Sequence, residues 1–542
     1  MQKYVGRGLA PAFVQHKGLK TLAKARVFFL TGKMIFGILK KTTQGEVLMK
    51  RIISLFLLLA TLLMTLAACA EGDTSQQNTD TTAAEESTEP AQLDAIPEDL
   101  KYNGEEIVIL SRAKQGWTQD EIAVPELNSE PVNDAIFNRN ITVFDRLNVS
   151  IVSAPIEDPD EYKPITEIES IVKAGSSDYD LVASACYTTM PSVLKGTFYD
   201  LTELEYLDLS RDYWMQSYNE LISYGQSQYT ATGMIALSTY RFAFVTMFNK
   251  NLFDNKNVPY LYDAVSSGEW TLDYQASLAA DFYQDLNGNG RHDEADLFGF
   301  ISCPGLSTDP YWSSCNMPIL EKNDAGEYVW VLDVGHVSDV VDKLLILFYD
   351  CGGTYLYKEE ASNTEQDEIR RMFAEGHSAM TTLRLIAVEQ PDVRDMEQMY
   401  GIVPMPKFDE AQEDYGTLMH DQFTVFCVPV SAAKEKLEMI GATLEVMASE
   451  SQRTVKPAYY EIALKRKYMS DPIAWEMLDL TFDRMITDAG VVYGLSLDFP
   501  HHMLRTIVNG KKNNASSKFA SVAKSCKRSL VKLQVKLEKL EE

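Results

Sequence analysis

Residues 106–110 read EIVIL, residues 149–152 read VSIV and residues 180–185 read DLVASA. Each run is short and rich in β-branched residues, which is typical of a strand. Between the first two runs, apolar residues recur at helical spacing over 131–147, and a second helical pattern covers 165–173. Strands that alternate with helices predict parallel pairing in an α/β layer. None of these strands leads into a glycine-rich phosphate-binding motif, so the sequence gives no support for nucleotide binding.

Further stretches, in a shared order and spacing, carry a resemblance. They are DYDLV at 178–182, YDL at 199–201, MFNKNLF at 247–253, GEWT at 268–271, FAEGHSAM at 373–380 and YGIVPMPK at 400–407. Together they resemble the family 1 extracellular solute-binding proteins of the maltose-binding-protein type, over roughly residues 100–540. Local physics agrees at two points. Thr271 suits the N-cap of a helix over 272–282, and Pro404 and Pro406 stop a strand from pairing further.

The resemblance implies an α/β, two-lobed periplasmic-binding-protein-like (type II) fold with a hinged interlobe cleft. Lobe 1 is expected at 100–240 with 378–430, and lobe 2 at 241–377 with 431–542. The chain would cross between lobes near Tyr240 and near Met380, and few crossings make a hinge. Beyond Lys518, leucines at 530, 533, 537 and 540 predict a helix docked on lobe 2.

The N-terminal part carries a targeting signal. Residues 49–69 read MKRIISLFLLLATLLMTLAAC, a positive start followed by an apolar run and small residues. The ending resembles the lipobox of bacterial lipoproteins, which implies a signal peptide at 49–68 and a palmitate-type lipid anchor on Cys69. The alternative is an uncleaved membrane-spanning helix. We interpret 1–48 as an extension upstream of a start at Met49; the alternative is a genuine cytosolic or membrane-inserting extension around Val27–Leu39. We interpret the polar stretch 69–99 as a disordered tether.

Charge and cysteine content exclude several classes. Residues 1–68 hold 11 Lys and Arg and one acid, so residues 69–542 hold 39 and 77, a net charge of −38. So acidic a body repels nucleic acid and anionic membrane surfaces. The seven cysteines form no CxxC pair, which argues against a zinc or thioredoxin-type motif. Cys303 and Cys315 could pair, although we expect them to be reduced.

Residues 285–296 read DLNGNGRHDEAD and predict a calcium loop. Asp285, Asn287, Asn289 and Asp293 supply side-chain oxygens at positions 1, 3, 5 and 9, and Gly290 stands at position 6, where the turn is sharp. Position 12 is Asp296 instead of the usual glutamate. We expect a calcium ion here in a structural role; the alternative is a polar turn without metal.

Aromatic rings and forked donors at strand ends are the ligand-binding candidates, because sugar rings stack on aromatics and hydroxyls need planar polar partners. They are Arg112, Tyr187, Tyr240, Tyr311, Trp312 and Arg384. For each one, ordinary packing is the alternative. After the segment ending in Met380 the family has an aromatic residue, whereas this chain reads TTLR at 381–384, so a maltose-like ligand is not implied.

No catalytic motif stands out, and chance pairs of carboxylates are unavoidable among so many acids. We expect a monomeric, non-enzymatic, extracytoplasmic lipoprotein that touches the membrane through its anchor only. It would bind a carbohydrate and deliver it to an ABC permease. The alternatives are a ligand sensor that feeds a sensor kinase, and a lipoprotein glycosidase.

Overall fold

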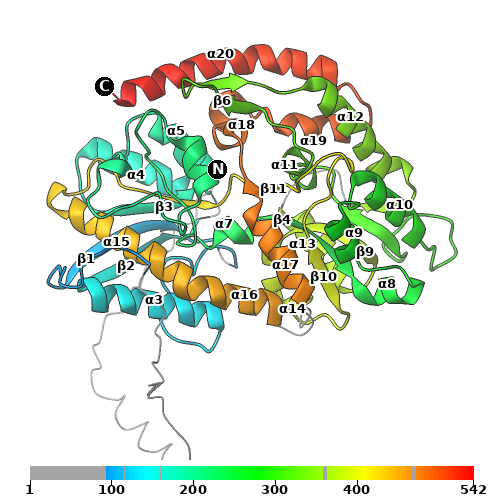
Figure 1. The fold of residues 1–542 in the computed structure, drawn as a ribbon, viewed down its shortest axis with the longest axis horizontal. Helices are drawn as coiled ribbons and strands as arrows, with labels where there is room; N and C mark the ends of the chain where they lie inside the picture. Colours follow the sequence, from blue (N-terminus) through cyan, green and yellow to red (C-terminus); the bar gives the residue numbers. More distant parts are fainter. Residues whose placement is uncertain (1–92, 115, 159, 358–362, 466–471, 542) are drawn as a thin grey trace, which may run out of the picture. The chain divides into compact units, whose positions relative to one another are not determined.

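The computed structural model describes residues 93–541, apart from 115, 159, 358–362 and 466–471. All of them belong to one compact unit, Thr88–Glu542. Cys69, the signal peptide at 49–68, the extension at 1–48 and most of the tether lie outside the described residues, so those interpretations stay predictions. Within the described part, two separate sheets divide the fold into the two lobes (Figure 1).

Lobe 1 is built on the sheet that the opening stretches predict. Its strands are β1 (Glu105–Arg112), β2 (Val149–Ile156), β3 (Leu181–Ala185) and β12 (Thr424–Cys427), in the order β12-β3-β1-β2. The pairs β1–β2 and β1–β3 are parallel, as expected, and β12 is antiparallel to β3. The connecting helices are α3 (Pro131–Leu147), α4 (Lys163–Ala174) and α5 (Cys186–Val193). The strand–helix alternation predicted from sequence is confirmed.

Lobe 2 contains a five-stranded mixed sheet in the order β10-β4-β9-β5-β8. The strands are β4 (Phe244–Asn249), β5 (Phe298–Ser302), β8 (Thr354–Leu356), β9 (Ser378–Arg384) and β10 (Tyr400–Val403). Its helices include α8 (Lys250–Lys256), α9 (Leu261–Ser267), α10 (Leu272–Phe282), α12 (Val334–Leu345) and α13 (Asn363–Ala374). The Thr271 hydroxyl accepts from the Tyr274 amide at 3.3 Å, so the predicted N-cap of α10 is confirmed.

The predicted lobe boundaries need correction. We placed 378–430 in lobe 1, but β9 and β10 both pair with β4 in lobe 2, and only β12 joins the lobe 1 sheet. We placed 431–542 in lobe 2, but α15 (Leu437–Glu450) and α16 (Lys456–Lys465) pack on α3 in lobe 1. The sequence of a strand indicates that the strand is buried, but it does not predict which strand lies beside it, because that depends on long-range contacts.

Several segments pass between the lobes. The first is α7 (Ser238–Arg241), at the crossing predicted near Tyr240, and a second runs from the end of β10 to β12. After α16, helix α17 (Pro472–Asp483) packs on β10 and α9 of lobe 2. No crossing lies at Met380, because Met380 is in the middle of β9.

The C-terminal helix α20 (Ala515–Glu541) follows α18 (Ala489–Val492) and α19 (His502–Asn509). It packs on α12, α19 and the short strand β7 (Tyr328–Trp330), with Leu530, Leu533 and Leu537 buried (Figure 1). The predicted helix on lobe 2 is therefore present. Its last turn also reaches lobe 1, where the Tyr229 hydroxyl donates to the Leu540 carbonyl at 3.0 Å. Among the described residues no helix has the length and apolarity needed to cross a membrane.

Candidate functional site

A cavity of about 750 Å³ lies at the carboxyl ends of β1 and β2. One wall comes from Arg112 and the residues after it, and the other from the acidic stretch after Ile156. The full lining is Arg112, Ala113, Lys114, Gln119, Ile156, Glu157, Asp158, Asp160, Glu161 and Pro164. The carboxyl ends of parallel strands are where open α/β sheets bind ligands.

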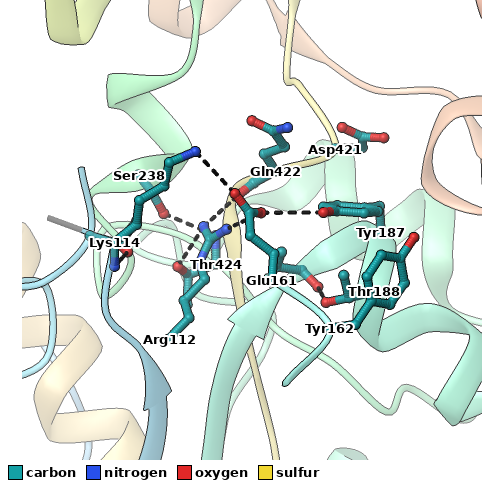
Figure 2. A network of polar contacts seen from close by, with 12 residues as sticks. Arg112, Lys114, Glu161, Tyr162, Tyr187, Thr188, Ser238, Asp421, Gln422 and Thr424 are labelled. Carbon is teal, nitrogen blue, oxygen red and sulfur yellow. Dashed lines mark hydrogen bonds and ion pairs between the residues drawn. The ribbon is translucent and has the colours of Figure 1, made fainter. Parts of the chain in front are cut away.

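Glu161 is the centre of the polar network beside this cavity (Figure 2). It accepts from Lys114 Nζ at 3.1 Å, from Arg112 Nη1 at 3.4 Å and from the Tyr187 hydroxyl at 3.4 Å. Burial alone would raise the pKa of Glu161, but Arg112 and Lys114 together hold that pKa below its usual range. The network therefore keeps a fixed negative charge at the cavity wall and fixes the direction of three donors.

Arg112 links this network to the strand that enters from the other side of the sheet. Its Nη2 donates to the Gln422 carbonyl and, at 3.1 Å, to the Thr424 hydroxyl (Figure 2). The Thr424 hydroxyl in turn donates to Glu121 Oε2 at 2.5 Å. Arg112 is only 6% exposed, so its orientation is set by these buried partners.

Arg384 approaches the same region from lobe 2, as the last residue of β9. It is 1% exposed, and none of its three guanidinium nitrogens has a hydrogen-bond partner among the described residues. Its guanidinium carbon lies 5.4, 5.3 and 5.6 Å from the ring centroids of Trp117, Phe242 and Phe244. Burial lowers the pKa of Arg384 to about 10, although Asp421, Glu161 and Asp309 partly oppose that fall. A fully buried cation without a hydrogen-bond acceptor among the described residues is an uncommon arrangement.

A second charged cluster, the Asp309 cluster (Asp309, His420, Asp421 and Arg505), lies close by. Arg505 of α19 makes a two-pronged ion pair with Asp309, with Nε at 2.7 Å from Oδ1. His420 Nε2 lies 3.6 Å from Asp309, and His420 Nδ1 lies 2.9 Å from Asp421. Burial alone would raise the pKa of Asp309, but Arg505 and His420 lower it. The cluster joins lobe 2 to the segment that leads into β12.

The structure brings three of the six predicted ligand residues together. Arg112 and Tyr187 both contact Glu161, and Arg112 and Arg384 share the ring of Phe242. Tyr240 lies elsewhere, edge-on to Phe482 with the ring centroids 5.0 Å apart.

Tyr311 and Trp312 of α11 (Tyr311–Ser314) are both buried, and the stacking role predicted for them stays a prediction. Trp312 is 4% exposed and borders a smaller cavity of about 360 Å³. Its indole donates to the His501 carbonyl at 3.0 Å and packs edge-on against Phe519 of α20. His501, whose carbonyl accepts this bond, is itself 3% exposed. A core aromatic and a cleft aromatic look the same in local sequence.

Sequence reasoning missed Glu161, Lys114 and Asp421. Glu161 belongs to the run EDPDEY at 157–162, which has the composition of a solvated loop. Its position a few residues after the second strand was the available signal, because the predicted ligand residues followed the first and third strands but not the second.

The predicted calcium loop folds into a polar turn of the expected shape. Asp285 accepts from the amides of Gly288 and Gly290 at 2.7 and 2.8 Å, and Gly290 has a φ of +68°. Asp293 accepts from the side-chain amides of Asn287 and Asn289. Asp296 is fully buried at the base of the loop. Over the described ranges no group of three or more His, Cys, Asp or Glu side chains is arranged to hold a metal, so calcium binding through mixed amide and carboxylate oxygens stays a prediction.

Comparison with known proteins identifies the fold. No family model matches the sequence, and no curated protein matches it. A cyclo/maltodextrin-binding protein complexed with maltotetraose has 13% sequence identity and a TM-score of 0.51, over 78% of this chain and 97% of that chain. The GacH receptor of Streptomyces glaucescens has 11% identity and a TM-score of 0.51, over 79% and 98%. UspC of M. tuberculosis has 12% identity and a TM-score of 0.50, over 78% and 100%. The chain therefore has the two-lobed fold of maltodextrin-binding-type solute-binding proteins.

Proposed function

We propose that this protein is the substrate-binding component of an ABC importer and that it binds a saccharide outside the cytoplasm. The observation that carries the proposal is the cavity of about 750 Å³ at the carboxyl ends of β1 and β2, in a two-lobed fold. Its size suits a small sugar, since ligand pockets typically measure roughly 300–1,000 Å³. The cyclo/maltodextrin-binding protein, which is complexed with maltotetraose, and the GacH receptor, which is described in complex with acarbose, support a saccharide ligand.

The chemistry of the lining favours hydroxyl groups. Glu157, Asp158 and Asp160 present acceptors for sugar hydroxyls, Gln119 presents both a donor and an acceptor, and Lys114 presents donors. Trp117, half-buried in the same segment but outside the cavity lining, lies beside Lys114, whose Nζ is 4.8 Å from its ring centroid, and it would offer an aromatic surface to a sugar ring. Polar groups held by a rigid network with one aromatic face can orient a sugar ring.

The network that holds Glu161 does not resemble catalytic machinery. A glycosidase needs a carboxyl group that stays protonated near neutral pH, together with a second ionised carboxylate. Arg112 and Lys114 instead keep Glu161 ionised. Ligand orientation is therefore the role that the contacts of Glu161 support.

The anchor belongs to the same proposal. A lipid on Cys69 would keep the protein at the membrane surface, and the polar stretch 69–99 would hold the lobes clear of it. The membrane partner would then be a permease that collects the bound sugar. Loss of labelled-sugar uptake on deletion of the gene supports a permease, whereas intact uptake with lost induction of sugar-responsive genes would point to a sensor kinase.

The test is a thermal-shift screen of the purified protein against mono- and oligosaccharides, followed by calorimetric titration of the hits. A ligand at about 100 times its Kd stabilises the folded form by about 2.7 kcal/mol, so a true ligand raises the Tm. Glu161→Gln should weaken binding at least several-fold. The matched control is Glu169→Gln, which removes a carboxylate that pairs with Lys195 between α4 and α5 and should leave affinity unchanged. A screen without any saccharide hit, or hydrolysis of the hit, would contradict the proposal.

A further inference from the structure

The guanidinium of Arg384 has no acceptor for any of its N–H groups among the described residues, although it is fully buried. An arginine side chain carries five N–H donors and remains charged in proteins. Removing such a group from water without hydrogen bonds is costly, and folded proteins rarely leave one in that state. The arrangement indicates that a partner for Arg384 comes from outside the chain.

The carboxylates that act on Arg384 do not fill this role, because each is already engaged. Glu161 is bound by Arg112 and Lys114, Asp309 is bound by Arg505, and Asp421 lies 2.9 Å from His420. Their charges favour the protonated form of Arg384 from a distance, but none of them accepts a hydrogen bond from it. The guanidinium of Arg384 is therefore left without a bonded anion at the point where lobe 2 faces the loop that follows β1.

Arg384 lies near the sugar cavity proposed above, although it is not one of the residues that line it. Arg112 and Glu161 line the cavity, and Arg112 shares the Phe242 ring with Arg384. The half-buried indole of Trp117, in the segment between Lys114 and Gln119 of the lining, covers one face of the guanidinium.

We infer that the ligand is an acidic saccharide, a uronic acid or uronate oligosaccharide, whose carboxylate pairs with Arg384 while its ring lies against Trp117. The inference rests on the proposed function and narrows its substrate class. A planar carboxylate matches the forked donors of arginine and supplies the missing charge, which a neutral hydroxyl does not. The acids at 157, 158 and 160 on the opposite wall would repel a carboxylate and accept from hydroxyls, so they orient the sugar with its carboxylate toward Arg384.

The experiment compares matched pairs of sugars that differ only at C6. Glucuronate, galacturonate and mannuronate, with their 1,4-linked disaccharides, are titrated by calorimetry beside glucose, galactose, mannose and the corresponding neutral disaccharides. We expect at least one uronate to bind the parent protein roughly tenfold or more tightly than its neutral counterpart, because a charge-assisted pair is the stronger contact. Arg384→Met should remove that preference, and Arg384→Lys should keep part of it.

The control variant is Arg139→Met, which removes an equally buried arginine whose partners are in α3, η7 (Ser451–Val455) and the 121–122 segment of lobe 1. It should lower stability but keep the uronate preference. If Arg384→Met does not fold, the Lys variant carries the comparison. Binding of neutral sugars without a uronate preference would overturn the inference and leave the proposed function standing. An unchanged preference in Arg384→Met would also overturn it, and binding of no saccharide at all would refute both.

Discussion

Replacing Arg384 by methionine should leave the ligand-free protein as stable as the parent or slightly more stable. Burial lowers the pKa of Arg384 from its usual value to about 10, and each unit of pKa corresponds to about 1.4 kcal/mol. A depressed cation pKa means that the charged form is disfavoured in the folded state. The penalty of roughly 3 kcal/mol is therefore complete at every pH below the folded pKa, including neutral pH.

The aromatic rings offset part of this penalty. The three ring centroids lie 5.3–5.6 Å from the guanidinium carbon, close to the limit of roughly 6 Å for cation–π contacts, so each contributes near the lower end of about 0.5–2 kcal/mol and the three together about 2 kcal/mol. Methionine keeps most of the packing volume and carries no charge, so the net gain should be no more than about 1 kcal/mol. Removing one member of a fully paired buried group instead lowers the free energy of unfolding, because its partners are left unsatisfied.

Arg139 provides that comparison. Burial lowers the pKa of Arg139 to about 10 as well, but Arg139 donates to the Ile122 carbonyl at 2.6 Å and to the Ser451 hydroxyl at 3.2 Å. Hydrogen bonds from a charged group contribute about 1.5–3 kcal/mol each, so Arg139→Met should destabilise by about 3 kcal/mol. The assay is urea unfolding of both variants without ligand, read as the shift in midpoint. A loss of stability in Arg384→Met as large as that in Arg139→Met would refute the reasoning, because it would mean that Arg384 has structural partners.

Four other outcomes follow from particular residues. Trp312→Ala should lower stability by about 3–5 kcal/mol, because the ring is buried against Phe519 and its indole N–H is bonded; a weaker saccharide affinity at unchanged Tm would instead restore the stacking role that we predicted from sequence. Calcium should raise the Tm and Asp285→Ala should remove that effect, whereas metal analysis that finds no calcium in the loaded protein would leave the 285–296 loop a plain turn. Cys69→Ser should release the protein from membranes, and membrane retention with unchanged mass would contradict lipidation. Burial raises the pKa of Glu445 to about 7, so the folded state holds this proton more tightly than the unfolded state, and stability should fall by up to roughly 3 kcal/mol as the pH rises from about 4.5 to 7. Glu445→Gln should flatten that slope in pH-dependent unfolding, and an unchanged slope would assign it to other groups.

Local patterns predicted the elements well and their partners poorly. The strands that became β1, β2 and β3, the intervening helices and the Thr271 cap follow from features within a few residues of each other. The lobe to which β9 belongs does not follow from local features, since Ser378–Arg384 is buried along its whole length and would suit either sheet. Its antiparallel register with β4, which pairs Phe244 with Arg384, depends on contacts across some 140 residues of chain.

The residues of the candidate site also differ in whether local sequence or tertiary contacts identify them. Arg112, Tyr187 and Arg384 were predictable because a polar side chain at the end of a buried strand is exceptional in its own local context. Trp312 and Tyr311 have the same composition and spacing whether they face a ligand or the core, and the docking of α20 decides which. Glu161 needed the tertiary structure, because only the approach of Arg112 and Lys114 separates it from the other acids in its loop.

The position of Arg384 also connects ligand recognition with lobe closure. Arg384 ends a strand of lobe 2, whereas Trp117 and Glu161 follow strands of lobe 1. If the lobes separate, water can solvate the guanidinium, so opening relieves the penalty that its unpaired state carries in the arrangement described here. A ligand shifts an equilibrium between two forms only by the difference in its affinity for them. A carboxylate that pairs with Arg384 in the closed form removes the penalty of that form, and this favours closure for acidic sugars over neutral ones at the same contact area.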